Sequence, residues 1–147
     1  MLNAFLPHLQ AIERDTGSTF WTDKQINAGE DWNQAIQSAI AYARLFVLLV
    51  SPDFIASDYI RNHEWPAIEE RRDGDPANVV VVRVLLKRCD HDQIETAIQA
   101  VPTAPQDGRL RAIADWRPHS NGYDQARREI KESMIRFNII PATTKVG

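Results

Sequence analysis

The sequence predicts an α/β fold, in which helices flank an open parallel sheet. Two apolar runs carry this prediction, Leu45–Val50 and residues 79–86, and neither shows the polar alternation of a half-exposed strand. Such runs are typical of strands buried on both faces, as in parallel sheets. Segments with helical spacing alternate with strand-like segments along the chain, which is the order that a parallel α/β sheet requires. The 147 residues suffice for one domain with a single core.

The N-terminal part of the chain predicts two helices around a short strand. The first helix ends near residue 17, and its apolar positions are Leu2, Phe5, Leu6, Leu9 and Ile12. Residues 18–22 are predicted to be a short strand, and the polar residues 24–31 are predicted to be a loop. The second helix has one apolar face, formed by Trp32, Ala35, Ile36, Ala39, Ile40 and Ala43.

The middle of the chain predicts a helix between the two apolar runs. It carries Glu64 and ends near Gly74, shortly before Pro76, a combination that stops helices. After the second run, Asp92 and Glu95 resemble a capping box. We therefore expect a short helix there, with Ile94, Ala97 and Ile98 as its apolar positions.

The C-terminal part predicts a weak edge strand at residues 110–114 and then a closing helix. The apolar positions of that helix are Tyr123, Ala126, Ile130, Met134 and Phe137. We expect the domain to span residues 1–138 and residues 139–147 to form a tail. Terminal residues without apolar anchors fray, so residues 141–147 are expected to be frayed.

Composition excludes several classes of protein. The net charge is −3 and the pI is about 5.8, which argues against a nucleic-acid-binding surface. Cys89 is the single cysteine, so an intrachain disulfide is impossible and a reducing compartment is expected. No apolar stretch has transmembrane length, and the N-terminus lacks the basic start of a signal peptide. We expect a cytoplasmic protein without membrane contact.

Three stretches in order resemble the TIR (Toll/interleukin-1 receptor) domain in its bacterial form. Residues 20–32 contain the pattern W-x-D-x-x-I-x-x-G-x-x-W, similar to the family's second strand and BB loop. Residues 45–64 contain LLVSPDF-x-x-S-x-Y and a downstream glutamate. Residues 80–90 are similar to the fourth strand and the loop after it. The resemblance implies the flavodoxin-like TIR fold, with sheet order 2-1-3-4-5.

The chain departs from the family pattern at its N-terminus. TIR domains begin with a strand of the type hydrophobic-Phe-Ile-Ser-Tyr, whereas this chain starts inside the first helix. The N-terminal strand missing from the chain occupies a central slot in the family's sheet, and an empty slot leaves two strand edges unpaired. We expect either that no strand occupies this slot, or that residues 137–140 or a segment of another copy fill it.

The resemblance implies a catalytic carboxylate at Glu64. Many TIR domains cleave NAD⁺ between nicotinamide and ribose, and the ribose becomes oxocarbenium-like as nicotinamide leaves. A nearby carboxylate stabilises that positive charge, as it does in glycoside hydrolysis. Glu64 would also hold the ribose hydroxyls. The alternative is an ordinary exposed glutamate in the first turn of a helix, where the macrodipole favours it.

The resemblance also implies a set of substrate-binding residues. They are Trp21, Asp23, Gly29, Trp32 and Tyr59. Trp21 would stack on a flat ring of the substrate, and Gly29 would let the BB-like loop approach closely. A role in the core competes with substrate contact for both tryptophans, and Tyr59 lies five residues before the glutamate rather than four, which leaves its role open.

Other site chemistries fit the sequence less well. Residues 89–92 contain side chains that can bind metals, but they lack the spacing of a zinc site, so no metal is expected. His63 and Glu64 begin a zincin motif that Ala67 does not complete. No glycine-rich phosphate loop is present, and neither Ser51 nor Ser57 has the glycine-flanked elbow of a hydrolase nucleophile.

The leading interpretation is a bacterial TIR domain that hydrolyses NAD⁺ to nicotinamide and linear or cyclic ADP-ribose. NAD⁺ is then a substrate, and no cofactor is needed. By resemblance the domain would act in immune-type signalling, with self-assembly into homo-oligomers as the switch. The alternative is a non-enzymatic adaptor that signals by TIR–TIR contact. A phospho-receiver fits less well, because the acidic cluster that follows its first strand is not found.

Overall fold

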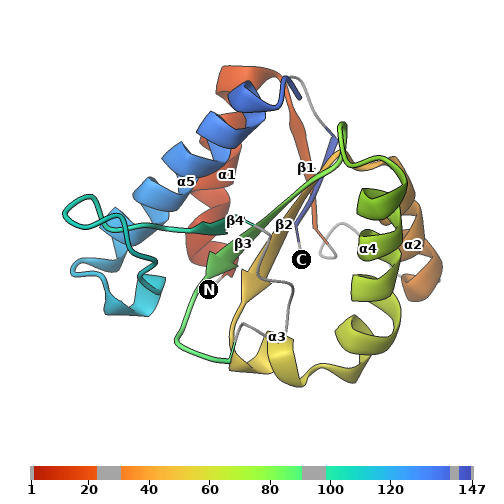
Figure 1. Ribbon diagram of the computed structural model, residues 1–147, viewed down its shortest axis with the longest axis horizontal. Coiled ribbons are helices and arrows are strands. Elements are labelled where there is room, and N and C mark those ends of the chain that lie inside the picture. Colours follow the sequence, from red (N-terminus) through yellow and green to blue (C-terminus); the bar gives the residue numbers. More distant parts are fainter. Residues whose placement is uncertain (1, 23–30, 91–98, 140–142, 147) are drawn as a thin grey trace.

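The computed structural model describes residues 2–22, 31–90, 99–139 and 143–146 (Figure 1). Within these residues, five strands form one sheet: β1 (Thr19–Trp21), β2 (Leu45–Val50), β3 (Val80–Leu85), β4 (Gln99–Val101) and β5 (Thr143–Val146). The α-helices are α1 (Leu2–Thr16), α2 (Trp32–Tyr42), α3 (Pro52–Ala56), α4 (Trp65–Gly74) and α5 (His119–Arg136). A π-helix, η2 (Ile60–Glu64), precedes α4, and a 3₁₀ turn, η4 (Ile113–Asp115), precedes α5.

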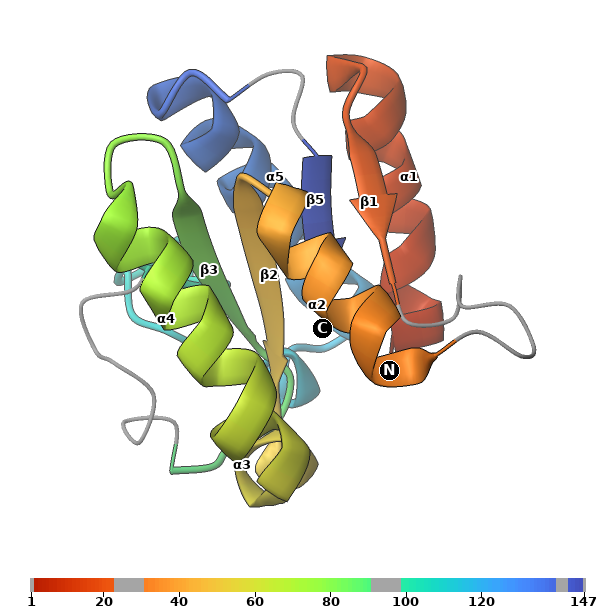
Figure 2. The same cartoon turned by 90° about the vertical axis from the view of Figure 1, so that its right-hand side faces the viewer.

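The predicted α/β class is confirmed, because every strand pair in the sheet is parallel and helices flank both faces. The strand order is β1-β5-β2-β3-β4. In Figures 1 and 2, α1 and α5 cover one face of the sheet, and α2 and α4 cover the other. Most of the apolar positions that predicted α1, α2 and α5 therefore lie on the faces that these helices turn toward the sheet. Trp32 and Phe137 were wrongly assigned to these faces, because they are 47% and 45% exposed.

The side chains of β2 alternate between two cores. Leu45 and Val47 belong to the cluster under α1 and α5, whereas Phe46 and Leu48 belong to the cluster under α2 and α4. These four side chains are at most 2% exposed. Both faces of this strand are thus buried, which explains why its sequence is a continuous apolar run.

The central slot of the sheet holds a strand from the C-terminal end of the chain. β5 lies between β1 and β2 and pairs in parallel with each of them over three positions. The expectation that another segment fills this slot is confirmed, but the expected filler, residues 137–140, was wrong. The expectation of a frayed tail was also wrong, because residues 143–146 form β5, which pairs with β1 on one side and β2 on the other.

One further prediction was wrong near the edge of the sheet. Residues 110–114 do not form a regular strand: Leu110 makes one isolated antiparallel bridge to Thr103, and η4 begins at Ile113. The edge strand is β4 instead, which pairs with β3. The predicted helix with its capping box at Asp92 lies outside the described residues.

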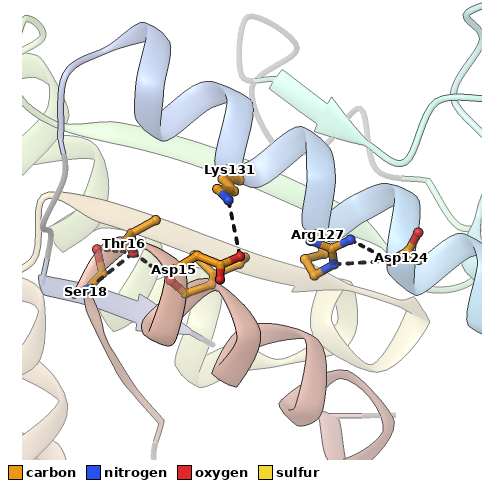
Figure 3. A network of polar contacts seen from close by, with 7 residues as sticks. Asp15, Thr16, Ser18, Asp124, Arg127 and Lys131 are labelled. Atoms are coloured by element: carbon orange, nitrogen blue, oxygen red, sulfur yellow. Dashed lines mark hydrogen bonds and ion pairs between the residues drawn. The ribbon is translucent and has the colours of Figure 1, made fainter.

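Polar contacts join α1 to α5 on the outer surface (Figure 3). Lys131 Nζ lies 3.2 Å from Asp15 Oδ2, which connects the two helices. Along α5, the Arg127 guanidinium donates to the Asp124 carboxylate, with Nη2 2.8 Å from Oδ1. Hydrogen bonds from Arg127 and Arg128 lower the pKa of Asp124, against a smaller opposing effect of burial. The first contact joins the two helices that cover one face of the sheet, and the others lie within α5.

Candidate active site

The segment after β2 is built from successive caps. Ser51 follows β2 directly and is the N-cap of α3, where its hydroxyl accepts a hydrogen bond from the Phe54 N–H. The hydroxyl of Ser57 then accepts one from the Ile60 N–H at 3.3 Å. Serine is a favoured capping residue because its oxygen satisfies an otherwise unpaired N–H group. The two caps fix the path of the chain between β2 and η2, and η2 ends at Glu64.

Glu64 is the last residue of the π-helix η2 and is 8% exposed. A π-helix widens the turn and re-aims the side chains along it, and such turns occur often at functional sites. The alternative of an ordinary exposed glutamate was wrong, because this carboxylate is buried. A buried carboxylate needs a partner, since desolvation of an unpaired charge is costly.

The partner of Glu64 is Lys145 in β5. The ammonium of Lys145 forms an ion pair with Oε1 of Glu64, and the lysine is 3% exposed. In the register of the sheet, Lys145 lies between Trp21 of β1 and Phe46 of β2. Its Nζ also lies 5.9 Å from the centroid of a Trp21 ring, within the range of a cation–π interaction.

Aromatic side chains stand beside the ion pair. The rings of Trp32 and Tyr59 are 4.5 Å apart between centroids, and the Tyr59 and His63 rings are 5.3 Å apart. The Tyr59 hydroxyl donates to Oδ1 of Asn33 at 2.7 Å. Burial raises the pKa of Tyr59, against a smaller lowering by a hydrogen bond with Gln37, and the charges of Glu64 and Asp31 add to the increase.

A cavity of about 180 Å³ connects these groups. It is lined by Trp32, Ile36, Ser57, Tyr59, Ile60, Glu64, Lys145 and Val146. Lys145 and Val146 are the last residues of β5, so the cavity lies at the carboxyl end of a central parallel strand, where open α/β sheets bind ligands. Its volume is below the roughly 300 Å³ at which pockets for drug-sized ligands begin, so it fits one ring-sized group.

The structure brings together three of the predicted site residues. Trp32, Tyr59 and Glu64 line the same cavity, and Trp32 is 47% exposed, so it is not a core residue. Trp21 does not line the cavity but contacts it through Lys145. Asp23 and Gly29 lie outside the described residues.

Sequence reasoning missed Lys145. No motif marks it, because it lies in a polar C-terminal segment that was expected to fray. Only the pairing of β5 with its neighbours brings this lysine into the site. Among the described residues, no group of three or more histidine, cysteine, aspartate or glutamate side chains is placed to hold a metal ion.

Comparison with known families agrees with this geometry. The family model described as TIR domain matches residues 8–130. The chain belongs to the TIR domain family. The matched region of this TIR domain includes the cavity residues on α2, η2 and the segment between β2 and η2, but it ends before β5.

One curated relative of this TIR domain is an uncharacterized protein, y4lF, of Sinorhizobium fredii (strain NBRC 101917 / NGR234). It is 33% identical over 129 residues, which cover 87% of this chain. The match covers 38% of the length of that relative. No solved structure matches the chain. No helix in the described part of the TIR domain is both long and apolar enough to span a membrane.

Proposed function

We propose that this TIR domain hydrolyses NAD⁺ at the bond between nicotinamide and ribose. The observation that carries the proposal is the buried carboxylate of Glu64 in the wall of a cavity that two aromatic rings also line. Membership of the TIR family, some of whose bacterial members cleave NAD⁺, supports it. The family membership by itself is equally compatible with a domain that only binds other proteins.

The geometry suits the chemistry of this cleavage. The C–N bond breaks with its electron pair on nicotinamide, which leaves neutral, and the positive charge moves to the ribose. A carboxylate held beside the ribose stabilises that charge more strongly in a buried site than in water. Water then adds to the ribose and loses a proton, which gives ADP-ribose, whereas attack by a group of the substrate gives a cyclic product.

The aromatic residues would bind the flat ring of the substrate. Trp32 is half-exposed at the first turn of α2, and its ring lies against Tyr59, so the pair forms one wall of the cavity. Offset stacking of aromatic rings contributes roughly 0.5–1.5 kcal/mol beyond burial of area. This wall would position the nicotinamide while Glu64 acts on the ribose.

Self-assembly in bacterial immune-type signalling is part of the proposal. The TIR family associates through TIR–TIR contacts, and the chain spans 38% of the length of the curated relative, so other parts of such a protein would carry the sensor. We place the reaction in the cytoplasm, with NAD⁺ as a substrate rather than a cofactor, and without nucleic-acid or membrane partners.

The experiment is the release of nicotinamide from NAD⁺ by concentrated protein, followed by liquid chromatography. Release above the spontaneous rate, with ADP-ribose or a cyclic form as the second product, supports the hydrolase. Its absence at every concentration, together with self-association of the domain, would favour a non-enzymatic adaptor. The ion pair between Glu64 and Lys145 is the observation that favours the adaptor, because it occupies the carboxylate.

A further inference from the structure

The strand in the centre of the sheet is unusually polar. Its sequence is Thr-Thr-Lys-Val, whereas its neighbour β2 reads Leu-Phe-Val-Leu-Leu-Val. Central parallel strands are buried on both faces and are ordinarily apolar throughout. A local sequence that conflicts with its place in the fold is expected mainly at functional sites. Packing alone therefore does not explain the polar composition of β5.

Lys145 can stay in this position only because Glu64 neutralises it. The lysine is 3% exposed, and removal of its partner would leave a buried charge uncompensated. The dependence is mutual, since the carboxylate is 8% exposed and meets the ammonium directly. When β5 occupies the central slot, its Lys145 ammonium therefore also occupies the Glu64 carboxylate.

The ion pair opposes binding of a cationic ligand. Of the residues that line the cavity, Glu64 and Lys145 are the charged ones, so their formal charges cancel. A pyridinium ring that enters the cavity meets an ammonium group as well as the carboxylate. The ammonium already neutralises the carboxylate, so a cationic ligand gains little net electrostatic attraction in this cavity.

β5 also limits the size of the cavity. Lys145 and Val146 contribute part of its lining, and the enclosed volume is about 180 Å³. Movement of this strand out of the slot would remove one wall and free the carboxylate together. Its pairing is short, over three positions with each neighbour, whereas β2 and β3 pair over six.

We propose that β5 is an autoinhibitory strand, with Lys145 as an internal counter-ion that keeps Glu64 from a cationic pyridinium ligand. The site opens when Lys145 leaves the carboxylate. This inference rests on the proposed function for the identity of the ligand, but not for the existence of the ion pair. The inference adds a regulated step, the release of Glu64 from Lys145, which membership of the TIR family does not by itself imply.

The test uses Lys145→Met, which removes the charge and keeps most of the side-chain length. Lys145→Gln is a second variant, because its amide can still donate to Glu64. The matched control is Lys131→Met on α5, where the lysine pairs with Asp15 at the outer surface. The probe is N1-methylnicotinamide, a pyridinium cation without a ribose bond, and calorimetry measures its affinity. Cleavage of NAD⁺ is measured separately on the same samples.

The inference predicts that Lys145→Met binds the cation about tenfold more tightly than wild type, whereas Lys131→Met binds it as wild type does. If Lys145→Met binds the cation more tightly but no variant cleaves NAD⁺, the proposal of an autoinhibitory strand stands and the proposal of NAD⁺ hydrolysis is rejected. Equal affinities in all variants, or no binding to Lys145→Met, would overturn the autoinhibitory strand whatever the cleavage rates.

A measurement on the unmodified chain covers the case in which both Lys145 variants fail to fold. If the cation binds only after Lys145 leaves, its binding must favour conformations in which β5 is released. Amide hydrogen exchange in β5 is then expected to accelerate when N1-methylnicotinamide is added, while exchange in β3 stays unchanged. Unchanged or slower exchange in β5 with the cation would contradict the inference.

Discussion

The ammonium of Lys145 contacts the carboxylate of Glu64, although the two residues lie 81 positions apart in the sequence. The contact joins the strand in the centre of the sheet to the end of the π-helix that carries the proposed catalytic group. Both side chains are buried, so each charge is compensated chiefly by the other. Stability and activity of this domain should therefore respond to the same two residues.

The first prediction concerns stability. Glu64→Gln leaves the Lys145 ammonium buried without a counter-charge, and we expect the free energy of unfolding to fall by about 3–5 kcal/mol. The double variant Glu64→Gln with Lys145→Met removes both charges and should recover most of that loss. Urea denaturation of the single and double variants measures the coupling. Strictly additive losses would show that the pair does not exist in solution.

The second prediction concerns the aromatic wall. Trp32→Ala removes the ring that packs on Tyr59, so we expect KM for NAD⁺ to rise by about tenfold, in line with the loss of one aromatic contact. Trp32→Phe keeps a ring and should restore most of the affinity. Steady-state kinetics separate the effect on KM from that on kcat. A drop in kcat with unchanged KM would place Trp32 elsewhere in the mechanism.

The third prediction concerns acid stability. Hydrogen bonds from Arg127 and Arg128 lower the pKa of Asp124 in the folded chain, so the folded state binds this proton less readily than the unfolded state. The stabilisation is present above the unfolded value of about 3.9 and is lost as the pH falls through the lower folded value. Between pH 5 and pH 2, the free energy of unfolding of Asp124→Asn should therefore fall by less than that of the wild type.

Urea denaturation at several pH values measures this loss. Asp73→Asn is the matched control, because the Asp73 side chain is 71% exposed and its nearest ion-pair partner, Arg72, lies 3.4 Å away at the surface. A control that changes the acid slope as much as Asp124→Asn does would rule out a special contribution from the α5 cluster.

The fourth prediction concerns assembly. If copies of the domain must associate to complete the site, the fraction of competent sites rises with protein concentration. Specific activity should then increase across a dilution series, and Gly29→Pro should abolish the increase by stiffening the BB-like loop. Light scattering on the same samples reports the oligomeric state. Constant activity per molecule over the whole series would reject activation by self-assembly.

Much of the fold could be predicted from the sequence because its main elements bury their own apolar patterns. Burial on both faces of β2 appears in the sequence as the apolar run Leu45–Val50. Burial of one face of α1 and of α5 appears as helical spacing of apolar residues. β5 could not be predicted in this way, because it is short and polar and becomes a strand only through pairing with β1 and β2.

The residues of the candidate site also fall into those that the sequence predicted and those that it did not. Trp32 begins α2, whereas Tyr59 and Glu64 lie in the segment between β2 and α4. The family motifs mark all three positions. Lys145 belongs to no motif, and its role depends on a contact between distant parts of the chain. The π-helix at Ile60–Glu64 was also missed, since a single wide turn does not change the apolar pattern that predicts a helix.

The most direct test of the central claim is the rate of nicotinamide release from NAD⁺ by Glu64→Gln. We expect a decrease of about 10²-fold or more, the size of effect seen when one key electrostatic contact to a transition state is lost. Glu132→Gln, an exposed glutamate on α5, is the matched control and should keep the wild-type rate. Circular dichroism at the assay temperature tests whether both variants are folded, because Glu64→Gln is expected to be less stable. A folded Glu64→Gln variant that releases nicotinamide at the wild-type rate would contradict the account.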